Sequence, residues 1–173
     1  ERVMGYQLIE TIEVGSGGAA SIEFTGIPQD GVDLAILLSG RTDYAGIGFP
    51  LYTTINSDTT STYVARYIRG DGSSVVSQTT STNIGIYSGF IASATSTSNS
   101  FENLSFYIPN YSGNAQKSFS VDTVGENNAT TAYQNIIAGL WPQTSAITTI
   151  TMTPLSSNFV QHSTASLYKI TAD

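Results

Sequence analysis

Cysteine is absent from the 173 residues of this chain. Disulfide bonds and thiolate metal sites are therefore excluded, and the sequence neither requires nor rules out an oxidising compartment. Charge is scarce as well: charged residues make up 11% of the chain, with 6 basic residues against 13 acidic ones and a formal net charge of -7. Such a chain repels phosphate backbones on average, so we expect no nucleic-acid partner.

Long apolar runs are also lacking. None approaches the roughly 20 residues that cross a bilayer, and no charged start followed by an apolar core marks a signal peptide. We therefore expect no membrane partner. Apolar residues at helical spacing never continue over ten positions, although residues 130–135 could form one helical turn.

The residues that are abundant favour strands. Ser, Thr, Gly and Asn replace the usual Lys and Glu, and apolar residues alternate with them, as in residues 20–25. Glycine-rich turns separate such segments, and the clearest hairpin joins residues 63–68 to 73–79. The pattern predicts an all-β fold: a single-domain, jelly-roll-like β-sandwich of about ten short antiparallel strands. It would span residues 1–173, with residues 1–5 as a flexible or processing-derived lead.

One segment, residues 33–39, is apolar on both of its faces. A strand of this kind must be covered on both sides, so we place it at the centre of a sheet. A second layer would cover one face, and a neighbouring subunit or long loops would cover the other. The candidate interface residues are Leu34, Ala35, Ile36, Leu37 and Leu38.

Catalytic motifs are missing from the sequence. The lone His162 has no Gly-x-Ser-x-Gly elbow to serve, so we interpret it as a surface or strand residue. A pair of carboxylates could hydrolyse a glycosidic bond, and adjacent expected strands carry Glu10, Glu13 and Glu23. Polar and apolar residues alternate around these acids, so we interpret them as solvent-facing charges that discourage aggregation. We predict that the protein is not an enzyme.

No metal-binding motif is present either, and we predict no metal site and no cofactor. Loop acids could supply a calcium site, but no motif supports one: Asp30, Asp33, Asp58 and Asp71. The tripeptide Arg69-Gly70-Asp71 is one that integrins bind. The turn of the expected hairpin is the stronger explanation, because Gly-Asp-Gly suits the geometry of a tight hairpin.

The chain contains 10 tyrosines and one tryptophan, Trp141. Aromatic side chains with a polar tip suit half-buried contacts, so core packing and subunit contacts are the favoured uses. Stacking on sugar rings is the alternative. The candidate glycan-contact residues are Tyr44, Tyr52, Tyr107 and Tyr111.

Two blocks of sequence carry a resemblance. Near the start lie Val14-Gly-Ser-Gly-Gly-Ala-Ala-Ser-Ile-Glu-Phe-Thr-Gly-Ile-Pro28 and Asp33-Leu-Ala-Ile-Leu-Leu-Ser39. Near the end lie Gly139-Leu-Trp-Pro, Ala146-Ile-Thr-Thr-Ile-Thr-Met and Asn158-Phe-Val-Gln-His-Ser-Thr-Ala-Ser-Leu-Tyr-Lys-Ile170. These blocks resemble small structural proteins of tailed bacteriophages. The likeness covers nearly the whole chain, although residues 46–100 are not distinctive.

The resemblance implies a non-enzymatic protein of the virion surface, assembled in the host cytoplasm. It would be a capsid decoration (cement) protein or a short head fibre that acts through protein–protein contacts. Its expected partners are further copies of itself, most simply in a trimer, and the major capsid or other virion proteins. The alternative is the receptor-binding tip of a tail fibre that recognises glycans of the host surface.

Overall fold

The computed structural model describes residues 4–46 and 48–172, and strands account for all of its regular secondary structure. The strands are β1 (Met4–Glu13), β2 (Ile22–Phe24), β3 (Asp33–Gly40), β4 (Phe49–Ile55), β5 (Tyr63–Gly70), β6 (Val75–Thr82), β7 (Ile86–Ile91), β8 (Glu102–Ile108), β9 (Lys117–Glu126), β10 (Ala132–Trp141), β11 (Ile150–Pro154) and β12 (Thr164–Ala172). All pairings between these strands are antiparallel.

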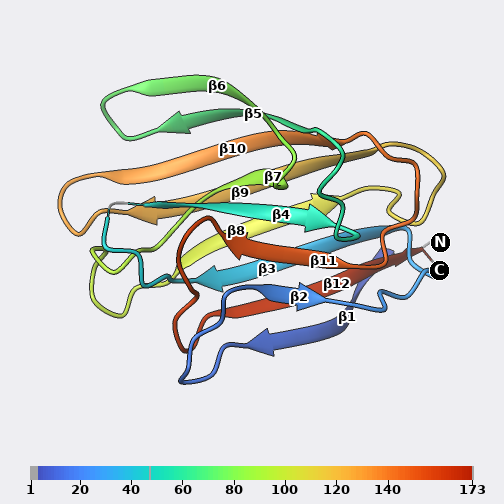
Figure 1. The fold of residues 1–173 in the computed structure, drawn as a ribbon, viewed down its shortest axis with the longest axis horizontal. Helices are drawn as coiled ribbons and strands as arrows, with labels where there is room; N and C mark the ends of the chain where they lie inside the picture. The colour runs from blue at the N-terminus through green and yellow to red at the C-terminus, as the bar shows by residue number, and fades with distance from the viewer. Residues whose placement is uncertain (1–3, 47, 173) are drawn as a thin grey trace.

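The strands form two sheets that face each other (Figure 1). The large sheet has eight strands in the order β1-β12-β3-β8-β9-β10-β5-β6, and the small sheet has four in the order β2-β11-β4-β7. The chain passes repeatedly from one sheet to the other. The predicted all-β sandwich is therefore confirmed, with twelve strands in place of about ten.

A jelly roll lies within this arrangement. With β5, β6, β9 and β10 set aside, eight strands remain, in the order β1-β12-β3-β8 in one sheet and β2-β11-β4-β7 in the other. Numbered one to eight along the chain, these strands have the orders 1-8-3-6 and 2-7-4-5. This is the double Greek-key order of the eight-stranded jelly roll. The two hairpins that were set aside, β5–β6 and β9–β10, are insertions that widen the large sheet at its β8 edge. We call these four strands the extension.

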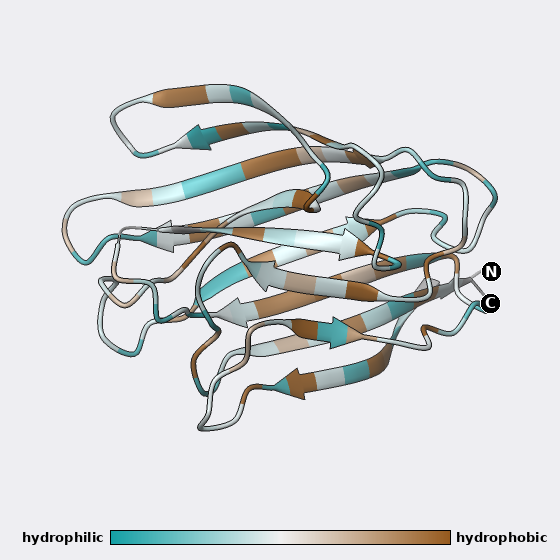
Figure 2. Ribbon diagram, viewed as in Figure 1, coloured by the Kyte–Doolittle hydropathy of each residue, from teal (hydrophilic) through white to brown (hydrophobic). Residues whose placement is uncertain are grey.

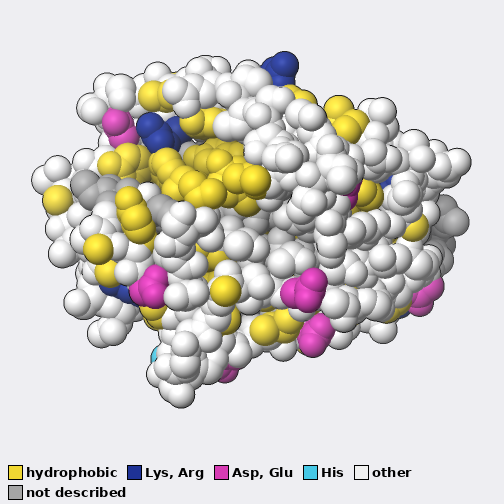
Figure 3. Space-filling view, viewed as in Figure 1, with side chains coloured by type: hydrophobic (Ala, Val, Ile, Leu, Met, Phe, Trp, Pro, Cys, Tyr) yellow, Lys and Arg dark blue, Asp and Glu magenta, His cyan; other side chains and the backbone are white. Residues whose placement is uncertain are grey.

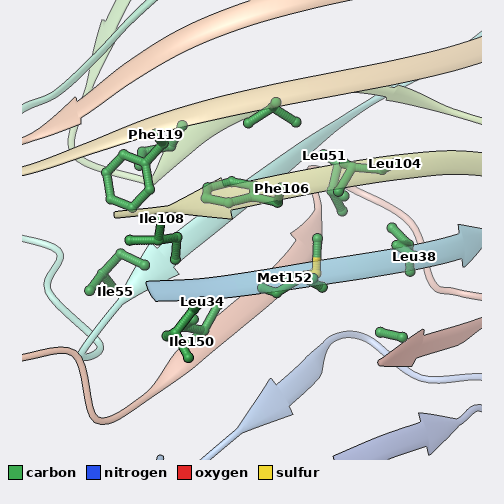
Figure 4. Close-up of a cluster of buried hydrophobic side chains, with 14 of the residues drawn as sticks. Leu34, Leu38, Leu51, Ile55, Leu104, Phe106, Ile108, Phe119, Ile150 and Met152 are labelled. Carbon is green, nitrogen blue, oxygen red and sulfur yellow. The ribbon is translucent and has the colours of Figure 1, made fainter. Parts of the chain in front are cut away.

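The core lies between the sheets. Hydropathy alternates along strands such as β8 and β9 (Figure 2), and the inward side chains of β3 and β8 meet those of β4 and β11 (Figure 4). Leu34, Phe106, Ile55 and Met152 are all fully buried there. Removing this apolar surface from water is the main source of the fold's stability.

β3 is internal to the large sheet, between β12 and β8, as its two apolar faces predict. Two details differ from the sequence-based expectations. β1 begins at Met4, so the last two residues of the expected lead belong to the sheet, and residues 1–3 lie outside the described part of the chain. Residues 132–135 pair with β9 in β10 and do not form the helical turn considered for residues 130–135.

Candidate functional site

The extension offers two surfaces, one on each of its faces. On the outer face, turned away from the small sheet, apolar side chains replace the polar ones that an exposed sheet face normally carries. Ile136 on β10 is 59% exposed and lies opposite Ile68 on β5, which is 53% exposed. We define the outer patch as Val64, Ile68, Val75, Val124, Ile136 and Leu140.

The register explains why these side chains form one surface. Antiparallel partners point to the same side of a sheet, so Leu140 and Val64 share the face of Ile136 and Ile68. Ala138 lies between Ile136 and Leu140 on β10, opposite Arg66 on β5. Shallow grooves follow this line of side chains, and their lining is mostly apolar.

Charges on this face are few and of both signs. Arg66 projects from β5, and Asp122 lies on β9 opposite Ile136. Asp122 accepts a hydrogen bond of 3.2 Å from Gln134. Within the part of the chain that the structure describes, Arg66 forms no ion pair. One positive and one negative side chain therefore lie beside the apolar residues of the outer patch.

A second group of exposed apolar side chains lies at the opposite end of the same sheet. Tyr6 and Leu8 on β1 are exposed, as is Leu37 on β3. Tyr6 packs edge-on against Tyr168 of β12, with ring centroids 6.1 Å apart. We call Tyr6, Leu8, Leu37 and Tyr168 the terminal-strand patch.

The structure divides the predicted interface segment between two environments. Leu34, Ile36 and Leu38 face the small sheet and are at most 2% exposed, so they are core residues and the prediction that they form an interface is wrong for them. On the other face Ala35 is buried, while Leu37 is 52% exposed. Of the five residues, only Leu37 offers substantial surface to a neighbour. Periodicity within one strand cannot locate the more exposed outer patch, because that patch depends on how β5, β9 and β10 pair.

The second surface lies at the edge of β7, where the large sheet extends past the small one. Figure 3 shows a hollow there, below the β5–β6 hairpin, in which hydrophobic side chains gather beside a basic one. Tyr67 and Arg69 of β5 meet Tyr87 and Phe90 of β7 in this region. We define the aromatic hollow as Tyr52, Tyr67, Arg69, Gln78, Tyr87 and Phe90.

The rings of the aromatic hollow pack against one another. Tyr87 is central: its ring centroid lies 4.7 Å from that of Tyr67 and 6.1 Å from those of Tyr52 and Phe90. The guanidinium carbon of Arg69 lies 5.1 Å from the centroid of Phe90, a cation–π contact. Tyr87 and Tyr67 are buried, whereas Phe90, Tyr52 and Arg69 are half-buried and reach the surface.

Polar groups surround these rings. The hydroxyl of Tyr67 donates to Oε1 of Gln78 on β6. Burial raises the pKa of Tyr87 far above its ordinary value; nearby Tyr67 and Tyr52 raise it further, and Arg69 opposes them. Burial also raises the pKa of Tyr52, with a smaller contribution from Tyr67. The burial of Tyr87 and Tyr52 therefore favours the neutral form of both hydroxyls.

The four tyrosines proposed as glycan contacts lie in different places. Tyr52 belongs to the aromatic hollow, and Tyr44 lies in the loop before β4. Tyr107 lies on the outer face of the large sheet and donates to Oδ2 of Asp33 at 2.6 Å. Tyr111 is fully buried, so its prediction as a glycan contact is wrong. The structure does not bring these four residues together, and no sequence pattern singled out Tyr67, Tyr87 and Phe90.

The loop acids considered for calcium are also separated by their partners. Asp30 pairs with Lys169, Asp33 binds Tyr107 and the Asn110 amide, and Asp58 binds Trp141. Among the residues that the structure describes, no three His, Asp or Glu side chains are grouped as metal ligands would be. His162 is exposed and lies 3.0 Å from Glu13, also exposed.

The Arg69-Gly70-Asp71 tripeptide is used by the hairpin itself. Oδ1 of Asp71 accepts hydrogen bonds from the backbone amides of Ser73 and Ser74 in the β5–β6 turn, and these bonds and those from the two serine hydroxyls lower its pKa. The side chain of Arg69 is packed on Phe90. The Asp71 carboxylate is therefore used by the turn, and Arg69 lies against a ring of β7.

Comparison of the chain with protein-family models, with curated proteins and with solved structures yields no match. Helices long and apolar enough to cross a membrane are not found in the described residues.

Proposed function

We propose that this chain is a non-enzymatic structural protein of a bacteriophage virion surface, either a capsid decoration protein or a short head fibre. It acts by burying the outer face of its large sheet against neighbouring proteins. The observation that carries this proposal is the outer patch, in which Ile136, Ile68 and Val75 are each more than half exposed.

Leaving the outer patch exposed to water costs free energy. Apolar area exposed to water is unfavourable by about 25 cal/mol per Å², and contiguous apolar patches on folded chains commonly mark protein contacts. The side chains project from paired strands, so they form a nearly flat, preordered surface that loses little entropy on binding. Ser and Thr side chains scattered over the same face can form the polar rim that surrounds the apolar centre of a protein interface.

The patches of the large sheet also suggest how copies would associate. The outer patch lies on the extension, and the terminal-strand patch lies at the other end of the same sheet. If the outer patch of one copy binds the terminal-strand patch of the next, the contact joins unlike surfaces and generates a closed ring where the rotation between copies closes. A trimer is the ring that the resemblance implies, and we propose that state. Paired outer patches would give a dimer instead.

The resemblance described above supports the virion as the site of assembly. It places no catalytic group on the chain, in keeping with an architectural role. The remaining exposed surface would then contact the major capsid protein or other virion proteins.

Size-exclusion chromatography with light scattering tests the self-association. Between about 1 and about 100 µM protein we expect a species of three times the 18.3 kDa chain mass. The double variant Ile68→Thr, Ile136→Thr should elute as a monomer with an unchanged thermal midpoint. The matched control is Leu155→Thr, which removes an exposed apolar side chain outside the outer patch.

A wild-type chain that stays monomeric throughout this range would overturn the proposed trimer. Equal weakening by the control variant would show that the outer patch is not the contact. A density map of the phage particle tests the virion assignment directly: the proposal requires copies of this β-sandwich on the particle surface, and it fails if the map contains none.

A further inference from the structure

We infer that the aromatic hollow beneath the β5–β6 hairpin is a binding site for an anionic sugar, a pyranose unit that carries a carboxylate. The site lies on the opposite face of the extension from the outer patch. This inference rests on different residues and does not require the proposed virion function.

The hollow lies on the extension, outside the strands that make up the jelly roll. The extension adds Phe119, Ile137 and Trp141 to the core on its inner face and also carries surface that the small sheet does not cover. Compact β folds often carry function in segments added to the scaffold. The β5–β6 hairpin brings Tyr67, Arg69 and Gln78 to the edge of β7, where the small sheet ends.

The rim of the hollow combines aromatic ring faces with polar groups. A pyranose presents C–H groups on its face and hydroxyls on its edge. The half-buried rings of Phe90 and Tyr52 can pack against that face, while the hydroxyl of Tyr52 and the amide of Gln78 can bind that edge. A simple apolar cap over the core would need none of these polar groups.

Arg69 places a positive charge at the rim of the hollow. Within the part of the chain that the structure describes, none of the acidic side chains forms an ion pair with Arg69. Its nearest acidic neighbour in sequence, Asp71, is held by Ser73 and Ser74. An unpaired guanidinium at the rim of a hollow offers a planar pair of donors that matches a carboxylate. The ligand is therefore expected to be acidic.

Two side-chain oxygens on the strands that border the hollow are buried without a hydrogen-bond partner in the part of the chain that the structure describes. Tyr87 Oη and Thr80 Oγ1 are buried and have no hydrogen-bond partner among the described residues, and they belong to β7 and β6, the strands that border the hollow. Unsatisfied buried polar atoms are rare in folded proteins because each is costly. Tyr87 is itself one of the rings of the aromatic hollow, so its unsatisfied hydroxyl favours a site for a hydroxyl-rich ligand over simple core packing.

Saturation-transfer difference NMR and amide chemical-shift mapping test the inference. The probes are tetragalacturonate and its fully methyl-esterified form, which has the same rings without the charge. We expect the acid to bind with chemical-shift changes confined to β5, β6 and β7, and the ester to bind about tenfold more weakly, because it loses a charge-assisted hydrogen bond.

Two arginines on β5 provide a matched pair of variants. Arg69→Gln should reduce the affinity for tetragalacturonate about tenfold, to that of the ester. Arg66→Gln removes the same charge from the opposite face of the same strand and should leave the affinity unchanged. Phe90→Leu should weaken the binding of both probes. A wild-type amide spectrum confirms that each variant is folded.

Three results would overturn the inference. The first is no binding of tetragalacturonate at about 10 mM. The second is equal affinity for the acid and the ester, or an equal effect of the two arginine variants. The third is a set of chemical-shift changes on the outer face of the large sheet. None of these results bears on self-association, so the two proposals can fail separately.

Discussion

The carboxyl group of Glu102 on β8 lies directly over Gly125 on β9. A Cβ atom at position 125 would stand 2.6 Å from the carboxyl carbon and from both of its oxygens. Oε1 of Glu102 accepts a hydrogen bond of 2.7 Å from the amide of Glu126, and Oε2 is buried with no partner among the described residues. Glycine at this position therefore makes room for a buried acid.

The first prediction concerns that space. Gly125→Ala should destabilise the fold by about 1 to 3 kcal/mol, because the new methyl group forces the Glu102 carboxyl to move within a packed environment. Urea unfolding measures the change. Gly70→Ala is the control: it is also a strand residue, but a Cβ there meets nothing within 4 Å. Its stability should be equal to wild type or slightly higher.

The second prediction concerns pH. Burial raises the pKa of Glu102 to about 7 from an ordinary value of 4.5; the neighbouring Glu126 adds to the shift, while the Glu126 amide and Arg41 oppose it. Because the folded state holds this proton more tightly than the unfolded state, the stability that Glu102 contributes is complete below pH 4.5 and is lost as the pH rises to about 7. The loss should amount to about 3 kcal/mol.

Glu102→Gln isolates this effect, since glutamine has the same shape and keeps an oxygen for the Glu126 amide. Urea midpoints at pH 5, 6, 7 and 8 should fall for the wild type and stay nearly level for the variant. At pH 8 the variant should be the more stable protein. Parallel curves for the two proteins would show that Glu102 is not the titrating group.

The third prediction assigns Tyr111 a structural role. Its hydroxyl donates to the carbonyl of Pro28 and accepts from the amide of Gly31 at 3.1 Å, and its side chain is fully buried. Tyr111→Phe should cost about 1 to 3 kcal/mol, because the Pro28 carbonyl and the Gly31 amide both lose their hydrogen-bond partner. Tyr6→Phe, at a 68% exposed position, should change stability by less than about 0.5 kcal/mol. Equal effects in urea unfolding would contradict the assignment.

The sequence predicted much of the fold because the strands alternate clearly and turn residues separate them. The internal position of β3 followed from its two apolar faces. The partners of each strand could not be predicted in this way. β1 pairs with β12 and β3 with β8, and such long-range pairings depend on contacts between segments that each carry the same pattern.

The surfaces were less predictable for the same reason. Ile68 and Ile136 each look like an ordinary strand residue, and only their pairing places them together on an outer face. Tyr67 and Tyr87 come together because β5 extends past the small sheet, where it meets the edge strand β7. Tyr111 follows β8 and looked like an exposed loop residue, yet it fills the core. Sequence alternation reports burial on one face of a strand but not which other strand covers it.

The last prediction concerns Asp58, which organises the turn between β4 and β5. Its Oδ2 accepts a hydrogen bond of 2.8 Å from Nε1 of Trp141, and its Oδ1 accepts from the backbone amides of Thr60 and Ser61. Burial alone would raise the pKa of Asp58, but the hydrogen bonds from Ser61, Trp141 and Thr60 outweigh it and hold the pKa well below 3.8.

Asp58→Ala should therefore destabilise the protein by about 2 to 4 kcal/mol, because the buried indole and two amides lose a charged acceptor. Trp141 is the only tryptophan, so its fluorescence reports the unfolding directly. A lowered pKa stabilises the fold above pH 3.8, and this contribution is lost on acidification below that value. The wild type should lose more stability than Asp58→Ala between pH 5 and pH 2. An equal acid sensitivity of the two proteins would show that the ionised form of Asp58 does not hold this turn.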